Sequence, residues 1–449
     1  VWDYIKNSGK FPQAKTLTFE WVGLFPGKRE SRRFNGLYTL TQQDVINQSI
    51  HYDAVAYGGW AIDLHPADGV YAGGNGCHQW HSKGVYQIPY RCYVTPDLDN
   101  LFVGGRIISS SHVANGTTRV MCTSALGGEV IGRAASICLS KGYKPIDLVD
   151  RDRIGLLQSL LVKNGNFIPG IAVAVEDNLA DSAEISVSSV LELDDLPADG
   201  TWFGLDYPIA QLIPVNGKVP VVRMNVKADN ATRLVMELRS SSKSENYTPD
   251  TIDAVLEFDL KKDENEIVAD FSYSYATPRY AFICLMKNPE ISVPMSGRLV
   301  TGLTAVYNYI NPAVSNFGKQ VPPEGIGVEE FEFWCPKRRP ESKNIAMSFA
   351  PSLASFNSEN LRNSYYRPYI GTNAWVPAFD DARPEVCFKW NGRKQIKTII
   401  LYFDTDTDQA METVQMGHFD ACVPTCYREY IIRDSEGKEL YHITGNHQT

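Results

Sequence analysis

The chain has 449 residues, of which 43% are hydrophobic and 21% charged, values that are ordinary for globular protein with buried cores. At roughly 150 residues per domain, this length predicts about three domains. The net charge of −9, with no strongly basic segment, argues against a nucleic-acid-binding protein. The sequence contains no run of about 18 apolar residues, so we expect no membrane-spanning helix.

The ends and the cysteines of the sequence carry limited information. The first ten residues, VWDYIKNSGK, lack an initiator methionine and the basic and apolar regions of a signal peptide. We therefore expect them to lie within a longer protein. Nine cysteines without a C-x-x-C pair do not decide the redox compartment. Residues 1–150 carry 14 Lys and Arg against 12 Asp and Glu, a mildly positive balance that suits an anionic cofactor.

Three regions differ in their residue patterns. Residues 1–178 are rich in Gly, Trp and His and mix strand-like with helix-like patterns. In residues 179–312, apolar and polar residues alternate in short runs, which is typical of half-buried antiparallel strands. Residues 313–449 begin with NFGKQVPPEGIG, a Pro- and Gly-rich stretch that predicts a linker. The strand-like runs are ISVSSVLEL, VPVVRMNV, RLVMELRS, DAVLEFDL and YAFICLM in the middle region, and TIILYFD and REYIIRD in the last.

The first region contains two predicted helices. One runs through RVMCTSALGGEVIGRAASICLSKG to Gly142, a natural C-terminal cap, and Thr117 and Thr118 are its N-terminal cap candidates. The other, DRIGLLQSLLVKNG, has an apolar stripe and ends at Gly165. Before the first helix, NLFVGGR predicts a buried strand that ends in a glycine turn.

The glycine turn followed by a helix is the feature that most suggests ligand binding. Gly104 and Gly105 have no side chains, so a ligand can approach the backbone closely. The N-terminus of the following helix presents free N–H groups and the positive end of its dipole, which can stabilise an anionic group. Close packing of a strand on a helix, without a ligand, is the alternative explanation of the same glycines.

These residues resemble a known family. The segment IPYRCYVTPDLDNLFVGGRIISSSHVANGTTRVMCTSALGGEVIGRAAS is similar to the last flavin-contacting segment of FAD-dependent oxidoreductases with two dinucleotide-binding domains. PGKRESRRFNGLYTLTQQDV and AYGGWAIDLHP also resemble a subgroup that is common in bacterial polysaccharide-degrading systems. The resemblance covers residues 1–178 and implies an incomplete α/β FAD-binding fold, with FAD as cofactor.

The resemblance also implies the residues of the cofactor site, with one departure. No G-x-G-x-x-G follows a strand anywhere, and GGNG at 73–76 lacks the acidic partner of a dinucleotide fingerprint. We therefore expect the N-terminal, adenine-binding half to lie upstream or to come from a partner chain. The implied cofactor contacts are Gly104, Gly105 and Arg106 beside the ribityl and phosphate part, Ser109 and His112 in the loop, and Arg119, Gly127 and Gly128 toward the isoalloxazine ring.

Candidate substrate contacts lie in two further motifs. Arg29, Arg32 and Arg33 belong to KRESRR, and their planar guanidinium groups suit carboxylates and phosphates. A solvated loop or a structural salt bridge to Glu30 is the alternative. Trp60, in GGWAIDLHP, is the fourth candidate.

Candidate catalytic residues follow in the same motif. Asp63 and His65 are two apart on an extended segment, so their side chains point to the same face. A carboxylate raises the basicity of an adjacent imidazole and suits proton transfer from a substrate hydroxyl; a structural hydrogen-bonded pair is the alternative. His112 is the other base candidate. A flavin that oxidises a carbinol needs such a base near the ring that takes the hydride.

The CHQWH motif raises the question of a metal. Cys77, His78 and His81 are ligand types that zinc prefers. The sequence has no fourth ligand at a standard spacing, so we expect no metal here and a polar loop around a buried Trp80 instead.

The last region has a resemblance of its own. RPYIGTNAWVPAFDDARPEVCFKW and YREYIIRDSEGKELYHITGNHQ resemble the discoidin-like, galactose-binding type of β-sandwich. The resemblance implies carbohydrate or partner binding, with Asn373, Trp375, Arg383 and Trp390 as candidate contacts. Aromatic residues that fill the core or a docking face are the alternative. The predicted fold class is an α/β segment followed by two β-sandwich domains, mixed overall and β-rich.

Together these features predict part of an FAD-dependent oxidoreductase that oxidises a carbohydrate-related or other hydroxylated substrate, either a small molecule or a glycan. Two alternatives stay open: a carbohydrate-binding or polysaccharide-cleaving, lyase-type protein, and a non-catalytic structural or assembly module. Bound flavin would favour the first function, and sugar binding without flavin the alternatives. Accessory sandwiches on a large enzyme favour a periplasmic or secreted protein.

Overall fold

The computed structural model describes residues 1–24, 32–172, 178–309, 318–322, 324–336, 343–404 and 426–446. The chain forms two units, Val1–Arg33 and Phe34–Thr449. In the first unit, α1 (Trp2–Asn7) precedes the 3₁₀ helix η1 (Pro12–Thr16). The Lys6 ammonium group ties the two together, because its Nζ donates to the carbonyl oxygens of Ala14 at 2.9 Å and Leu17 at 2.7 Å.

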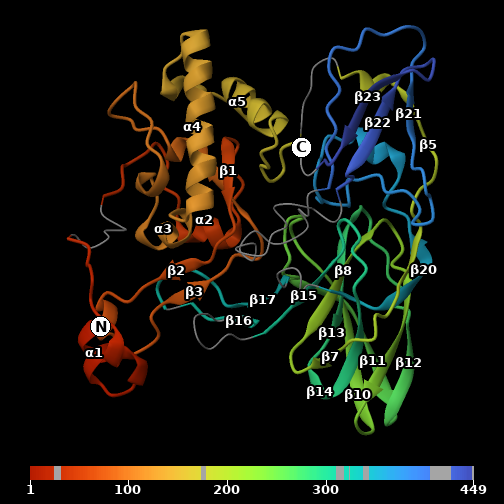
Figure 1. Ribbon diagram of the computed structural model, residues 1–449, viewed down its shortest axis with the longest axis horizontal. Coiled ribbons are helices and arrows are strands. Elements are labelled where there is room, and N and C mark those ends of the chain that lie inside the picture. The colour runs from red at the N-terminus through yellow and green to blue at the C-terminus, as the bar shows by residue number, and fades with distance from the viewer. Residues whose placement is uncertain are drawn as a thin grey trace. The chain divides into compact units, whose positions relative to one another are not determined.

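The second unit begins with an α/β segment (Figure 1). Its strands form two antiparallel pairs, β1 with β4 and β2 with β3. Helices α4 and α5 contact each other and both contact β1, while α3 contacts β2. The elements are α2 (Gln42–Asn47), β1 (Ala54–Gly58), β2 (Ile62–Leu64), β3 (His78–Trp80), β4 (Tyr86–Pro89), α3 (His112–Thr118), α4 (Met121–Lys141) and α5 (Arg151–Lys163).

Helix α4 confirms the longer predicted helix and its C-terminal cap. It ends at Gly142, which takes the left-handed conformation with φ 70° that glycine adopts without a steric penalty. The predicted N-terminal caps were wrong. Thr117 and Thr118 are buried inside the separate helix α3, which Ser111 caps by accepting a hydrogen bond from the backbone of Ala114 at 3.1 Å.

Helix α5 confirms the second predicted helix. The Asp150 carboxylate caps it by accepting from the backbone N–H groups of Asp152 and Arg153, and Gly165 follows its end with φ 92°. Its apolar stripe is buried together with one face of α4. The core of the segment unites this stripe (Ile154, Leu157, Leu161, Val162) with Val130, Ala134 and Cys138 of α4 and with Ala54, Val55, Ala56, Tyr86 and Ile88 of β1 and β4.

The predicted strand at NLFVGGR was wrong. Phe102 forms only an isolated bridge with Val94, so no strand extends along this stretch. Isolated backbone hydrogen bonds hold the chain here instead; for example, the Val103 amide donates to the Tyr93 carbonyl at 2.9 Å. Gly105, with φ 64°, then turns the chain into a 3₁₀ helix, Gly105–Ile107.

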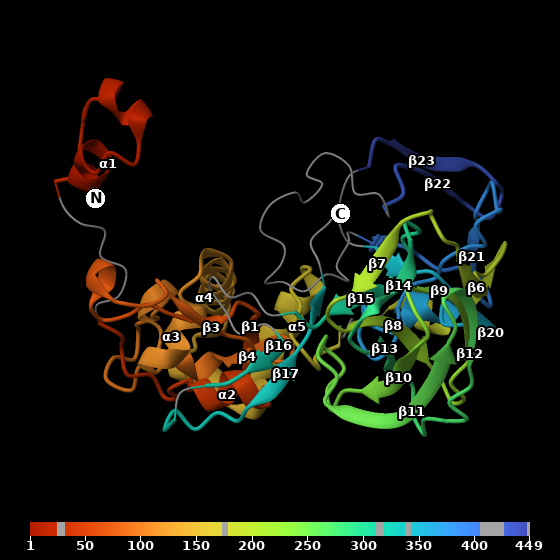
Figure 2. The same cartoon turned by 90° about the horizontal axis from the view of Figure 1, so that it is seen from below.

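The middle region forms a β-sandwich of two antiparallel sheets (Figure 2). The six-stranded sheet has the order β11-β10-β13-β8-β15-β18. In the seven-stranded sheet the order is β19-β14-β9-β20-β6, with β12 paired to β9 and β7 to β14. The strands are β6 (Leu193–Leu196), β7 (Trp202–Leu205), β8 (Ile209–Val215), β9 (Val221–Ala228), β10 (Thr232–Ser240), β11 (Thr251–Leu260), β12 (Asp263–Ala269), β13 (Arg279–Leu285), β14 (Asn288–Ser296), β15 (Thr304–Tyr307), β18 (Cys335–Pro336), β19 (Asn344–Ile345) and β20 (Met347–Leu353).

Burial within this sandwich follows the alternation of its strands. Ile209 and Ile213 of β8 enter the core between the sheets, whereas Ala210 and Leu212 enter a second cluster with Trp334. Strand β8 is therefore buried on both faces, and the outer face of the six-stranded sheet is partly covered. The runs VPVVRMNV, RLVMELRS, DAVLEFDL and YAFICLM correspond to β9, β10, β11 and β13, which confirms them as strands.

The strand pairing runs across position 312, between the middle and the last region. Strands β18, β19 and β20 complete the two sheets of the middle sandwich although they follow residue 312. Strand β5 (Glu184–Val187) pairs with β21 (Val386–Lys389) of the last region. Strands β16 (Gly318–Gln320) and β17 (Phe331–Phe333) pair with each other, and Phe331 packs against the core of the α/β segment.

The described part of the last region contains β21 and a hairpin of β22 (Glu429–Arg433) with β23 (Glu439–Thr444). REYIIRD is therefore a strand, as predicted. TIILYFD, at 398–404, is not a strand; Ile399 and Ile400 are 48% and 55% exposed, although Tyr402 stacks on Tyr366 with 4.2 Å between ring centroids. Overall, the fold is mixed and β-rich. Within the described ranges, no helix combines the length and the apolar character needed to cross a membrane.

Candidate functional site

The half-buried carboxylate of Asp63 stands at the centre of the candidate site. Arg119 Nη2 lies 3.3 Å from Asp63 Oδ2 and donates to the Asp63 carbonyl oxygen at 3.1 Å. His65 Nε2 lies 3.3 Å from the same Oδ2. The side chains of Asp63 and Arg119 are only 15% and 13% exposed, and that of His65 is 43% exposed. The predicted pairing of Asp63 with His65 therefore forms, and Arg119 joins it.

Local packing explains how these residues meet. Asp63 is the middle residue of β2, and α3 packs directly on this strand. A Cβ atom on Gly116 of α3 would lie 3.1 Å from the Asp63 backbone nitrogen and oxygen, so glycine permits the close approach. Thr117 Oγ1 donates to the Trp60 carbonyl at 2.6 Å. These contacts fix the end of α3 so that Arg119 reaches the carboxylate.

The cluster has unused hydrogen-bonding capacity. Asp63 Oδ1 is buried and has no hydrogen-bond partner among the residues that the structure describes. His65 Nδ1 lies 3.0 Å from the Gly76 carbonyl oxygen, so both ring nitrogens face acceptors, and only a doubly protonated ring can donate to both. Burial, and then the nearby charge of Asp63, raise the pKa of the Cys77 thiol. The geometry thus offers one free carboxylate oxygen beside a half-exposed imidazole.

The two glycines of the predicted turn differ in their surroundings. A Cβ on Gly104 would lie 2.7 Å from Ile131 Cδ1 of α4, so Gly104 is required for packing of the turn on the helix. Gly105 has a positive φ, and its Cβ position is open, with no described atom within 4 Å. Arg106 follows it and is exposed. Gly105 and Arg106 therefore present the accessible side of the turn.

Gly127 and Gly128 of α4 also differ in how much space surrounds their Cβ positions. A Cβ on Gly127 would lie 2.9 Å from Cε1 of the buried Tyr93. A Cβ on Gly128 would have no described atom within 4 Å. Gly127 therefore allows α4 to pack on its own core, whereas Gly128 lies on the outward face of the helix.

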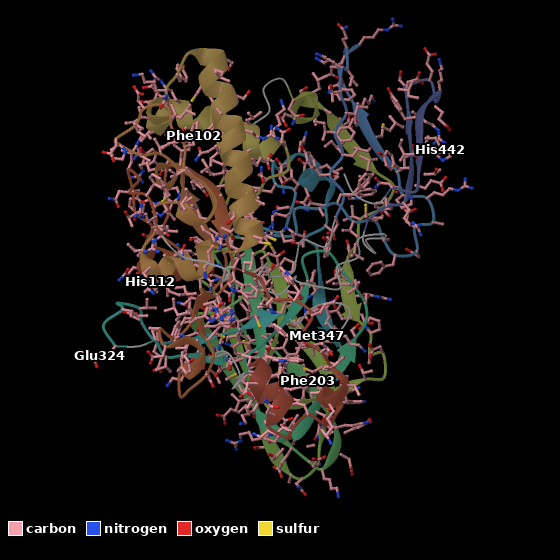
Figure 3. The ribbon with its side chains drawn as sticks, turned by 60° about the vertical axis from the view of Figure 1, so that its left-hand side comes forward. Phe102, His112, Phe203, Glu324, Met347 and His442 are labelled. Carbon is pink, nitrogen blue, oxygen red and sulfur yellow. The ribbon has the colours of Figure 1, made fainter. Side chains whose placement is uncertain are left out.

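The two loop candidates also occupy different environments. Ser109 is 1% exposed, and its Oγ is 3.0 Å from Thr39 Oγ1, which favours a structural role over direct contact with a cofactor. His112 is exposed and begins α3 (Figure 3). It stands seven positions before Arg119, about 10 Å along a helix axis.

The remaining candidate contacts belong to the first unit, precede β2 or lie outside the described residues. Arg29 lies outside the described residues. Arg32 and Arg33 end the first unit, where Arg32 is exposed and Arg33 is half-buried. Trp60 is half-buried immediately before β2 and meets α3 through its carbonyl group.

The CHQWH motif is divided between two environments. His78 is exposed and stacks on Trp80, with 5.9 Å between ring centroids, whereas His81 is buried and stacks on Phe333 at 4.3 Å. Throughout the described ranges, no three His, Cys, Asp or Glu side chains converge in a way that would hold a metal ion. The sequence alone did not predict the interaction of Cys77 with Asp63, because the two residues are 14 positions apart and meet only through the pairing of β2 with β3.

The aromatic candidates of the last region are engaged in internal contacts. The indole N–H of Trp375 donates to the Ser189 carbonyl at 2.9 Å, and that of Trp390 donates to the Leu179 carbonyl at 2.8 Å. Both side chains are half-buried. This geometry favours the docking-face alternative for these two tryptophans.

Comparison with known protein families identifies the α/β segment. Residues 1–161 match the family FAD dependent oxidoreductase. No curated protein and no solved structure shows significant similarity to the chain. The matched residues include Asp63, Gly105 and Arg119. The match supports membership of this segment in the FAD-dependent oxidoreductase family, a general oxidoreductase function, and FAD as the cofactor of that family.

Proposed function

We propose that this chain contributes part of the flavin and substrate pocket of an FAD-dependent oxidoreductase that oxidises a hydroxylated, carbohydrate-related substrate. The observation that carries the proposal is the half-buried Asp63 carboxylate. It lies beside Arg119 and His65 within the family match, and its buried Oδ1 has no hydrogen-bond partner among the described residues. Buried polar groups are rarely left unpaired unless a ligand, water or function accounts for them. A substrate hydroxyl would supply the missing donor.

Residues of the turn and of α4 fit one side of an FAD site. Gly105 leaves its backbone open to close approach, and the exposed Arg106 guanidinium suits an anionic group. Gly128 leaves the outward face of α4 equally open. When bound, the flavin supplies the acceptor for a hydride from the substrate carbon.

The Asp63 cluster suits the proton that accompanies such an oxidation. Asp63 Oδ1 would accept a hydrogen bond from the substrate hydroxyl and orient it, while Arg119 holds the carboxylate in place. The His65 ring, on the exposed side of the carboxylate, would exchange the proton with solvent. General acid–base assistance of this kind contributes about 10²–10⁴-fold to a rate.

The outward face of α4 suits a covering domain. Met121 and Leu139 on this face are 87% and 88% exposed, and Gly128 and Gly132 between them have open Cβ positions. Small residues allow another backbone to approach closely. We propose that the adenine-binding domain, from upstream sequence or from a partner chain, covers this face and completes the site.

The test is visible absorbance with cofactor extraction on the chain co-expressed with the polypeptide encoded immediately upstream. We expect tightly bound FAD, which is lost when Arg106 and Arg119 are both replaced by Ala. The matched control replaces Arg153 and Arg223, two half-exposed arginines, and should keep its colour. A well-folded but colourless complex that takes up no added FAD would overturn the proposal.

The role of Asp63 is tested separately on the coloured complex. Asp63→Asn should retain flavin but slow its reduction by sugar alcohols or sugars by about 100-fold or more. Anaerobic stopped-flow absorbance measures this rate. An unchanged reduction rate in Asp63→Asn would assign the carboxylate a structural role only.

A further inference from the structure

A cavity of about 310 Å³ lies at one end of the six-stranded sheet. Its size is at the lower end of the range for small-molecule sites. None of its lining residues belongs to the segment that matches the oxidoreductase family. They are Ser241, Ser242, Lys243, Ser244 and Asn246 of the loop after β10, Thr277, Pro278, Arg279, Tyr280 and Phe282 at the start of β13, and Ile370.

The strand pairing explains why a cavity forms here. Strands β10 and β13 are paired up to Ser240 and Ala281. Beyond that pair, β13 continues through Tyr280 and Arg279, which pair with β8 on their other side. The chain after Ser240 leaves the sheet as the loop 241–250, so the space beside Arg279 and Tyr280 is not filled by a neighbouring strand.

The loop that forms one wall is held by several hydrogen bonds. The Asp250 carboxylate accepts from the backbone and hydroxyl groups of Ser242 at 2.9 and 2.7 Å, and it pairs with Lys83 at 3.2 Å. Thr248 Oγ1 donates to the Trp334 carbonyl at 3.0 Å. A wall fixed in this way needs little ordering when a ligand binds.

Two polar groups at the cavity lack partners. Arg279 Nε and Asn246 Oδ1 are both buried, and neither has a hydrogen-bond partner in the described part of the chain. Asn246 as a whole is only 5% exposed, and its amide nitrogen donates to Ser241 Oγ at 2.8 Å. A buried donor and a buried acceptor left unpaired are costly, so a ligand that supplies both partners would be stabilised.

The wider lining combines positive charge, hydroxyl groups and an apolar wall. Lys243 Nζ donates to the Gln48 carbonyl oxygen, which uses one of its three donors. Tyr280 and Phe282 supply flat apolar surface. Ile370, at the rim, has φ 66°, which is rare for a β-branched residue and is the kind of local strain found at ligand-holding sites.

Neighbouring acidic groups offset this positive character only in part. Asp250 is already paired with Lys83 and Ser242. Glu245 lines a separate, water-sized cavity of about 30 Å³ next to this one. Burial raises the pKa of Glu245, and the charge of the nearby Lys243 lowers it, so Glu245 faces one of the two cations of the cavity and leaves Arg279 as the other.

We propose that this cavity binds a monosaccharide-sized sugar that carries an anionic group, either a carboxylate or a phosphate. Arg279 and Lys243 hold the anionic group. Asn246 Oδ1 and the serine hydroxyls hold the hydroxyl groups of the sugar, and Tyr280 contacts its apolar face. The site is independent of the flavin chemistry proposed above.

Isothermal titration calorimetry on the full chain tests this site with four probes: glucuronate, glucose 6-phosphate, glucose and inorganic phosphate. We expect binding of one or both charged sugars, and binding of glucose and of phosphate alone that is at least about tenfold weaker, since a charged hydrogen bond contributes about 1.5–3 kcal/mol. The tighter of the two charged sugars identifies the anionic group. Phosphate binding as tightly as the charged sugars, equal binding of neutral glucose, or no binding of any probe would each overturn the proposal.

Variants locate the binding within the cavity. Arg279→Gln should weaken binding of the charged sugar by about tenfold or more, whereas Arg233→Gln, at an exposed arginine of β10, should leave it unchanged. Thr277→Asp places a negative charge at an exposed rim position and should weaken binding even if Arg279→Gln fails to fold. Unchanged affinity in Thr277→Asp and in a folded Arg279→Gln would place the ligand elsewhere and refute this assignment.

Discussion

The adjacent glycines of α4 allow a sharp test of how this helix packs. Gly127 and Gly128 are both in the helix interior, where replacement of Gly by Ala stabilises an exposed position by about 1 kcal/mol. At Gly128 nothing described lies within 4 Å of the new methyl group, so Gly128→Ala should realise the full gain. At Gly127 the methyl group would lie 2.9 Å from Tyr93 Cε1 and 3.1 Å from its Oη.

The clash at Gly127 offsets the gain in helix propensity. Tyr93 is 1% exposed and has no solvent side to which it can move. Overpacking of a well-packed core costs about 1–3 kcal/mol, so Gly127→Ala should be neutral to destabilising by up to about 2 kcal/mol. The two variants have the same composition and change adjacent positions of the same helix, which makes each the control for the other.

Amide hydrogen exchange, measured by mass spectrometry on peptides from residues 121–141, reports how each substitution changes the local stability of α4. Gly128→Ala should slow exchange in α4 by about fivefold, the equivalent of about 1 kcal/mol, and Gly127→Ala should leave it unchanged or accelerate it. Equal effects of the two substitutions would refute the assignment of buried and outward faces. If the outward face is covered in a flavin-containing complex, Gly128→Ala should also weaken assembly while stabilising the isolated chain.

Two further predictions concern stability. Asp53 is fully buried and accepts two hydrogen bonds from the Arg91 guanidinium at 3.0 and 3.1 Å. Asp53→Ala should therefore lower the free energy of unfolding, measured by urea titration, by about 3–5 kcal/mol. The control Asp99→Ala removes one partner of an exposed ion pair and should not shift the unfolding transition. Burial lowers the pKa of His81 to about 3, whereas the pKa of histidine in an unfolded chain is about 6.5. Between these two pH values the unfolded chain binds a proton that the folded chain does not. The contribution of neutral His81 to the free energy of unfolding is therefore complete above about pH 6.5 and declines by up to about 1.4 kcal/mol per pH unit as the pH falls toward 3. His81→Phe should flatten this dependence between pH 7 and 5, while the same change at the exposed His78 should not; parallel curves for all three proteins would contradict the prediction.

Local patterns determined much of the regular structure. Alternation marks β9, β10 and β11 in the sequence because each strand has one face in the sandwich core. Strand β13 is a continuous apolar run instead, because its two faces enter two different clusters. The stripe of α5 and Gly142 at the end of α4 are likewise local signals. The Asp63–His65 pair belongs to the same class, since residues two apart on an extended chain share a face.

Long-range packing decided the features that the sequence did not predict. NLFVGGR and TIILYFD have strand composition, but among the described residues neither forms a ladder with a neighbouring strand, and a strand needs such a partner for its backbone groups. Arg119 reaches Asp63 from 56 positions away only because Gly116 allows α3 to approach β2. The pairing of β5 with β21 spans about two hundred residues and has no local signature.

The sequence by itself therefore predicted a segment that resembles FAD-dependent oxidoreductases, with a glycine turn and an Asp–His pair, and several β-strands with a buried face. Only the tertiary structure decided which residues are accessible. It buried Ser109 and Gly127 and packed Gly104 against Ile131. It left the Cβ positions of Gly105 and Gly128 open, and it formed a polar cavity from a loop after β10 and the start of β13. The reason is physical: periodicity and residue type are local properties, whereas burial and unpaired polar groups depend on segments that meet only after the chain has folded.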